Sequence, residues 1–135
     1  MTTTLNAVTS TGLVQTSDGS GVIKVQSNGV TTNALAWVNF NGVTTTTIRA
    51  SYNVSSITRA SAGNYQVNFT NSLTDINYAP IISTGDGSQV TNIDVNYNSS
   101  GTLTAPTTSA FIFSTSLIGV SARDQTYINV VVFGN

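Results

Sequence analysis

The chain has 135 residues, 39% of them hydrophobic and only 7% charged, so it carries enough apolar material for one folded domain and is not typical of a disordered chain. Its net charge of −1 excludes the basic surface that nucleic-acid binding requires. The absence of cysteine excludes disulfides, and every apolar run is too short to span a bilayer, so we expect no membrane insertion.

The first 33 residues differ in composition from the rest of the chain. They are rich in Thr, Ser and Gly, and few of them, such as Leu13, Val22 and Val30, are apolar enough to be buried. They also lack the basic and apolar blocks of a signal peptide. This composition predicts an N-terminal arm over residues 1–33, followed by a β-sandwich module over residues 34–135.

Most of the chain alternates apolar and polar residues with a period of two, which is typical of half-buried antiparallel strands. β-branched residues dominate these runs, and no adequate stretch has the 3.6-residue period of a helix. Gly and Asn separate the runs and tolerate the positive φ of tight turns. Short strands at this spacing are typical of a sandwich or barrel, and we expect an all-β, jelly-roll-like antiparallel β-sandwich. The expected strands lie near residues 22–26, 35–40, 48–54, 64–69, 76–83, 93–97, 110–115 and 128–133.

Three tyrosines fall in phase with the apolar positions of their expected strands. They are Tyr52 in residues 48–54, Tyr65 in residues 64–69 and Tyr97 in residues 93–97. Residues two apart in a strand share a face, so this phase places each ring on the side that meets the core. We therefore expect these three tyrosines to serve packing.

Trp37, the only tryptophan, lies out of phase with its neighbours. Ala36, Val38 and Phe40 alternate on the other side of the same strand, so Trp37 should face away from the core. An outward aromatic ring is suited to stack on a sugar or to contact another protein. We favour the protein interface, because both faces of this strand would be covered in a packed oligomer.

The expected strands have few of the residues that protect sheet edges from pairing with other chains. Lys24 is the only lysine, Pro80 and Pro106 are the only prolines, and the C-terminal strand is uncharged. Identical chains that cover such edges would form a symmetric oligomer, which we expect here. A monomeric barrel with a hydroxyl-rich surface is the alternative.

The usual catalytic side chains are missing, because the sequence contains no His, Cys or Glu. Two aspartates can serve a glycosidase, but most of the five stand in turn-like contexts where Asp bonds its own backbone. We therefore expect no enzyme activity. The same absence leaves only hard cations as metal partners, and stretches such as residues 18–21 and 86–88 offer one carboxylate each, so we expect no metal and no cofactor. The five aspartates are Asp18, Asp75, Asp86, Asp94 and Asp124.

Several segments, in this order and spacing, resemble a module of tail fibres and related virion proteins of tailed bacteriophages, notably marine and cyanobacterial ones. The resemblance covers nearly the whole chain, its central block is fairly specific, and residues 85–109 match poorly, as variable loops would. Residues 12–21 and 25–30 are similar to shaft-proximal segments that often precede the module. The central block comprises residues 36–42 (AWVNFNG), 48–59 (IRASYNVSSITR), 63–70 (GNYQVNFT) and 75–78 (DINY), and residues 127–134 (YINVVVFG) look like its final strand.

The resemblance implies a virion structural protein on the outside of the particle, trimeric in most fibre contexts. We expect it to attach to the host surface, with a glycan or protein as receptor, and to contact other virion proteins. Fibre proteins usually carry this module at the end of a longer chain, and a chain that starts at Met1 leaves no room for an anchoring domain. An excised fragment, a short fibre docked on another tail protein and a capsid decoration (cement) protein therefore stay open. The expected receptor or interface contacts are Trp37, Asp86, Ser88, Asn98 and Ser99.

Overall fold

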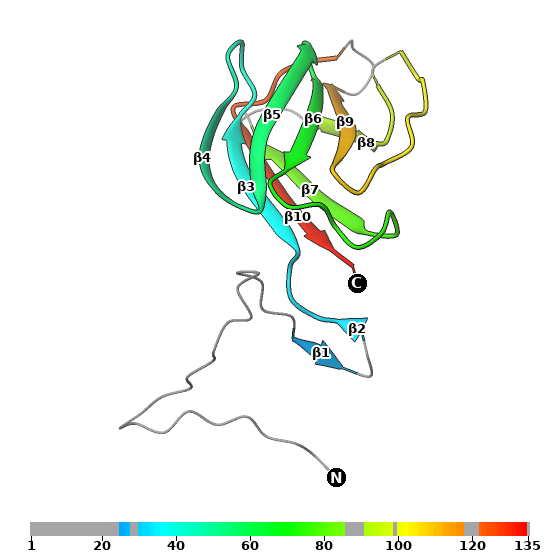
Figure 1. The fold of residues 1–135 in the computed structure, drawn as a ribbon. Coiled ribbons are helices and arrows are strands. Elements are labelled where there is room, and N and C mark those ends of the chain that lie inside the picture. Colours follow the sequence, from blue (N-terminus) through cyan, green and yellow to red (C-terminus); the bar gives the residue numbers. More distant parts are fainter. Residues whose placement is uncertain (1–24, 28–29, 86–90, 99, 118–121, 135) are drawn as a thin grey trace, which may run out of the picture.

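The protein is an all-β sandwich of two four-stranded antiparallel sheets, as the computed structural model shows (Figure 1). The structure describes residues 25–27, 30–85, 91–98, 100–117 and 122–134. Within these ranges it has no helix, and so none that is long and apolar enough to cross a membrane. A separate two-stranded sheet pairs β1 (Gln26–Ser27) with β2 (Val30–Thr31). The sandwich consists of β3 (Ala36–Asn41), β4 (Thr47–Tyr52), β5 (Val54–Ser61), β6 (Asn64–Phe69), β7 (Ala79–Gly85), β8 (Thr91–Val95), β9 (Ala110–Leu117) and β10 (Tyr127–Phe133).

Each sheet is built around a strand from the second half of the chain. The order β4-β3-β10-β7 forms one sheet, called here the β10 sheet, and the order β5-β6-β9-β8 forms the β9 sheet. The uncharged C-terminal strand β10 thus pairs with a neighbour on both sides. Its backbone hydrogen-bonding groups are used within the sheet, so it needs no protection as an edge.

The C-terminal strand, which the sequence analysis cited as unprotected, is therefore not an edge of this sandwich. Its four edge strands are β4, β7, β5 and β8, and each carries one charged residue or proline, either of which discourages pairing with another chain. The faces of the sheets therefore offer an alternative route to self-association. The four residues are Arg49 in β4, Pro80 in β7, Arg59 in β5 and Asp94 in β8.

The core between the sheets is a stack of aromatic rings closed by aliphatic side chains. Tyr65 packs against Phe40 and Phe113, with ring centroids 5.5 Å and 5.3 Å apart, and Phe111 continues the stack. The predicted inward phase of Tyr65, Val67 and Phe69 is confirmed, because all three are buried. From β10, the core receives Ile128, Val130 and Val132.

Residues 48–52 and 54 are in strands as expected, but not in one strand, because the chain changes sheets between them. β4 ends at Tyr52, Asn53 adopts a positive φ of 54°, and β5 begins at Val54 in the other sheet. A bulge opposite Asn39 also shifts the register of β4, which reverses the phase of Ala50 and Tyr52 relative to Ile48. Tyr52 is consequently 37% exposed and faces outward.

The core position predicted for Tyr97 is wrong for a similar reason. β8 ends at Val95, and Asn96 has a positive φ of 61°, so the alternation stops before Tyr97. The Tyr97 side chain is 41% exposed. A single left-handed residue is enough to turn the following side chain away from the core.

Candidate functional site

The outer face of the β10 sheet carries a row of apolar side chains that crosses all four strands. Trp37 in β3 lies directly opposite Tyr52 in β4 and Val131 in β10, and Val131 lies opposite Ile81 in β7. Directly opposed residues share a face of an antiparallel sheet, so these four side chains form one line, called here the apolar row. Ile81 is 61% exposed and Trp37 38% exposed, so the row meets solvent.

A parallel row of small and amide side chains lies beside the apolar row. Asn39 pairs with Ala50 on one side and Asn129 on the other, and Asn129 pairs with Ser83. The Asn39 Nδ2 group donates to Asn129 Oδ1, and Asn129 Nδ2 donates to Ser83 Oγ at 3.3 Å. This amide row bonds laterally within the sheet, which fixes its side chains in one arrangement.

Arg49 and Tyr127 border the amide row on its far side. The Arg49 Nη2 group donates to the carbonyl oxygen of Thr126 at 2.8 Å, and the guanidinium carbon lies 4.5 Å from the centre of the Tyr127 ring. A cation above an aromatic ring is attracted by the electron density of that ring. The single charge on this face is therefore held down on the protein by neighbours of its own chain.

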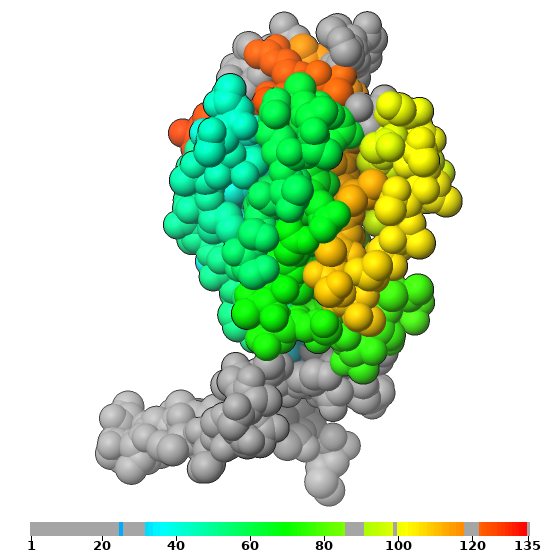
Figure 2. Space-filling view, turned by 45° about the horizontal axis from the view of Figure 1, so that its top comes forward, coloured from blue at the N-terminus to red at the C-terminus, as the bar shows by residue number. Residues whose placement is uncertain are grey.

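The two outer faces of the sandwich differ sharply in polarity. Five exposed large apolar side chains stand in sandwich strands, and all five belong to the β10 sheet, namely Trp37, Tyr52, Ile81, Tyr127 and Phe133. The β9 sheet presents amides, hydroxyls and a carboxylate instead, including Gln66, Asn68, Asn92 and Asp94. Figure 2 shows part of that second face, where β5, β6 and β9 lie side by side. Ten large apolar side chains are exposed in the described part of the chain, and the five in the β10 sheet share one sheet face, which makes that face a candidate contact surface.

The predicted contact residues do not form one site. Trp37 lies outward on β3, as its phase predicted, and its partially exposed ring is part of the apolar row. Asn98 lies between β8 and β9, on the other sheet, and its Oδ1 accepts from the backbone N–H groups of Ser100 and Thr102, so it holds a turn. Asp86, Ser88 and Ser99 lie outside the described residues.

The sequence reasoning missed the partners of Trp37 on the outer face. Tyr127 and Phe133 alternate along β10 with the buried Ile128 and Val132 and so lie on the outer face. The two-residue period of this strand was therefore enough to predict their outward orientation. Tyr52 gave the opposite signal, because the bulge in β4 is not visible in the sequence pattern.

Asp124 is the centre of a polar cluster at one end of the sandwich. The single N–H of Arg59 Nε is shared between both carboxylate oxygens, at 3.0 and 3.1 Å, and Arg59 Nη2 donates to Oδ2 at 2.7 Å. The backbone N–H of Gly63 and the hydroxyl of Tyr65 also donate to Asp124 Oδ1, at 2.9 and 2.8 Å. The cluster ties the segment before β10 to the β5–β6 hairpin.

These contacts fix the charge state of Asp124. Burial alone would raise its pKa, but the hydrogen bonds from Arg59, Gly63 and Tyr65 outweigh burial and lower the pKa to about 2. Burial and the hydrogen bond to Asp124 together raise the pKa of Tyr65 well above its ordinary value. A carboxylate this acidic and this fully bonded is a poor proton acceptor, so the cluster is suited to hold the fold rather than to do chemistry.

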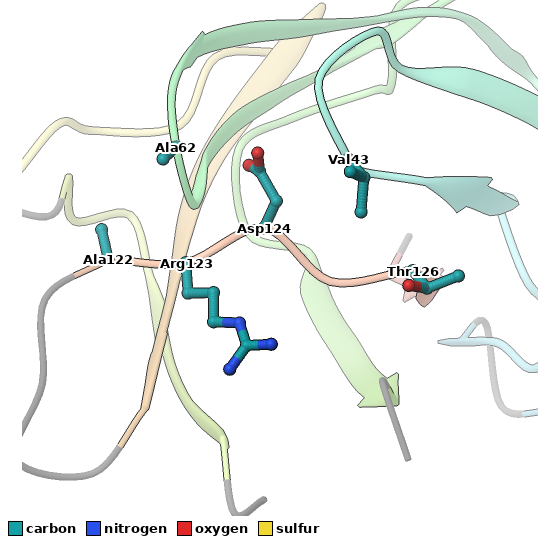
Figure 3. Close-up of a pocket in the computed structure, with 6 residues that line it drawn as sticks. All are labelled: Val43, Ala62, Ala122, Arg123, Asp124 and Thr126. Carbon is teal, nitrogen blue, oxygen red and sulfur yellow. The ribbon is translucent and has the colours of Figure 1, made fainter. Parts of the chain in front are cut away.

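A hollow of about 400 Å³ lies beside this cluster (Figure 3). Its walls include Val43, Ala62 and Ala122, and the side chains of Arg123 and Asp124 point to opposite sides of the chain. Among the described residues of its wall, the acidic side chain is Asp124, which Arg59 already neutralises, and the basic side chain is Arg123.

The other described aspartates are also bonded locally. Asp75 accepts from the backbone N–H of Asn77 at 2.7 Å, and Asp94 accepts from Asn92 Nδ2 at 3.0 Å. The described part of the chain contains no group of three His, Cys, Asp or Glu side chains that could hold a metal ion.

The hydrogen bond from the Tyr65 hydroxyl to the charged Asp124 carboxylate can be tested by substitution. We expect Tyr65→Phe to lower the free energy of unfolding by about 1.5–3 kcal/mol, because a hydrogen bond to a charged group is lost. Tyr78→Phe is the matched control, since its hydroxyl donates to the neutral carbonyl oxygens of Thr107 and Ala110. It should cost only about 1 kcal/mol. Urea titration measures both, and equal losses would contradict a special role for the charged cluster.

Comparison with known proteins assigns this chain to no family. No protein family, curated protein or solved structure matches it. What bears on its function is therefore the pattern of its sequence and the geometry described above.

Proposed function

We propose that this chain is a structural module on the exterior of a tailed-phage virion, of the tail-fibre or receptor-binding type, that mediates attachment to the host surface. The sequence blocks that resemble fibre modules support this proposal, and they include the Trp37 strand and the final strand β10. The proposal assigns the module no catalytic, metal or cofactor role, and its described carboxylates are bonded to residues of the same chain.

The single observation that carries the proposal is the difference between the two outer faces. One sheet presents hydroxyls and amides to solvent, and the other presents the apolar row together with Tyr127 and Phe133. A rigid sandwich with one such face is suited to bind through shape. The trimeric state and the jelly-roll-like class that we expect for this module belong to the same proposal.

Adsorption of the purified chain to host cells tests attachment. We expect the labelled chain to bind intact host cells saturably and to slow adsorption of the phage when added in excess. Binding that cells lacking the phage receptor retain, or no binding to any strain that the phage infects, would contradict the proposal.

A capsid decoration protein is the second candidate, and the two-faced sandwich favours it as well. A decoration protein needs one face for the capsid and one for water, which the apolar and hydroxyl-rich faces provide. Quantitative mass spectrometry of purified virions separates the two functions. Decoration predicts hundreds of copies per virion, whereas a fibre predicts few, and complete absence from the particle would exclude both.

A further inference from the structure

We propose that the outer face of the β10 sheet is the surface through which copies of this chain associate, with the apolar row turned toward the symmetry axis of the oligomer. The inference deepens the proposed function, since it names the partner of the face described above. It uses a face of the sheet rather than a strand edge, since β10, the uncharged C-terminal strand, is not at an edge.

The apolar area of the face matches the area that a stable protein contact needs. The exposed fractions of its five large apolar side chains run from 36% for Phe133 to 61% for Ile81. If a whole side chain of this size has roughly 200 Å² of surface, the exposed parts of the five add up to on the order of 400 Å² of apolar surface. A standard interface buries about 800 Å² per partner, a little over half of it apolar, or about 450 Å².

The near absence of charge on this face favours an uncharged partner, such as the same face of a second copy. Arg49 is the only charged residue in the four strands of the β10 sheet, and it is bonded to Thr126 and stacked on Tyr127. A strongly acidic or basic partner would find little to pair with. Two copies of this face would meet with minimal charge repulsion, because Arg49 stands at the border and the rows between are uncharged.

The amide row makes the face complementary to itself. An asparagine side chain carries both donors and acceptors, so a row with Asn39 and Asn129 can bond to an identical row. Lateral bonds already hold these side chains in place, which lowers the entropy lost on association.

A sugar ligand fits only part of the same surface. Trp37 and Tyr52 would stack on a sugar ring and the neighbouring amide row could bond its hydroxyls, but Val131 and Ile81 continue the row to the opposite edge without an aromatic ring for stacking. Aliphatic side chains offer a sugar hydroxyl no hydrogen bond, whereas they pack well against another protein. A second copy therefore uses the whole row.

Sedimentation and tryptophan fluorescence of the full chain test the inference. We expect an oligomer of fixed stoichiometry between roughly 1 and 100 µM, the range of ordinary specific contacts. Because Trp37 is the only tryptophan, its ring should become accessible to the quencher acrylamide when dilution dissociates the oligomer.

We expect Ile81→Lys to raise the dissociation constant at least about tenfold, because it places an amine in the apolar row. Asn92→Lys adds the same charge on an edge strand of the opposite face and should leave the constant unchanged.

Circular dichroism and thermal unfolding of both variants confirm that they are folded before association is compared. A wild-type chain that stays monomeric to 100 µM would overturn the inference, as would an oligomer that Ile81→Lys leaves intact. A monomer whose Trp37 fluorescence shifts only when host glycan is added would assign the face to sugar instead. If the chain does not associate but virions contain it, the inference is wrong and the proposed function still stands. If the chain associates but virions lack it, the proposed function alone is wrong.

Discussion

Gly63→Ala should destabilise the sandwich by about 3–5 kcal/mol or prevent folding. Gly63 has a φ of +69°, and a Cβ atom there would lie 2.3 Å from the carbonyl oxygen of Thr115 and 2.7 Å from the backbone nitrogen of Arg123. Both neighbours are backbone atoms, so neither can rotate away. The strain of positive φ adds about 1–2 kcal/mol to this clash. Thermal and urea unfolding measure the loss.

Gly101→Ala is the matched control for Gly63→Ala. Gly101 has a similar φ of +75°, but a Cβ atom there would meet nothing within 4 Å. It should therefore lose only the strain of positive φ, about 1 kcal/mol. The difference between the two variants isolates the cost of close approach, and equal losses would show that β9 and the segment before β10 can move apart freely at Gly63.

Asp124→Asn should lower the free energy of unfolding by about 2–4 kcal/mol at neutral pH, and the melting temperature by roughly 10 °C. The amide carries no charge for Arg59 and has one acceptor oxygen where the carboxylate serves Arg59, Gly63 and Tyr65. Asp94→Asn is the control, because Asp94 is exposed on the outer face of the β9 sheet and should change stability little.

The pH dependence of that loss gives a second measurement. The folded protein lowers the pKa of Asp124 to about 2, so its stabilisation is fully present above the ordinary carboxyl pKa of about 4 and disappears as pH falls through 2. The shift corresponds to about 2 kcal/mol. The gap between wild type and Asp124→Asn should therefore shrink between pH 4 and pH 2. A gap that stays constant over this range would mean that the charge of Asp124 contributes nothing.

Together these tests separate two parts of the molecule with different tasks. The Asp124 cluster and Gly63 hold β5, β6 and the segment before β10 together at one end of the sandwich. The Asp124 carboxylate there is already neutralised by Arg59. The outer face of the β10 sheet is held by regular strand pairing and leaves its apolar row exposed. Variants of the first part should change stability, and variants of the second should change association.

The sequence alone determined the all-β class, the inward phase of Tyr65, Val67 and Phe69, and the outward phase of Trp37. These follow from the two-residue period of a strand, which depends only on neighbours along the chain. The tertiary structure decided which strands are edges and which side chains join Trp37. A bulge in β4 turned Tyr52 outward, the chain passed to the other sheet at Asn53, and pairing brought Val131 and Ile81 into line with Trp37 from distant parts of the chain. Register between strands is set by long-range packing, so no local pattern reveals it.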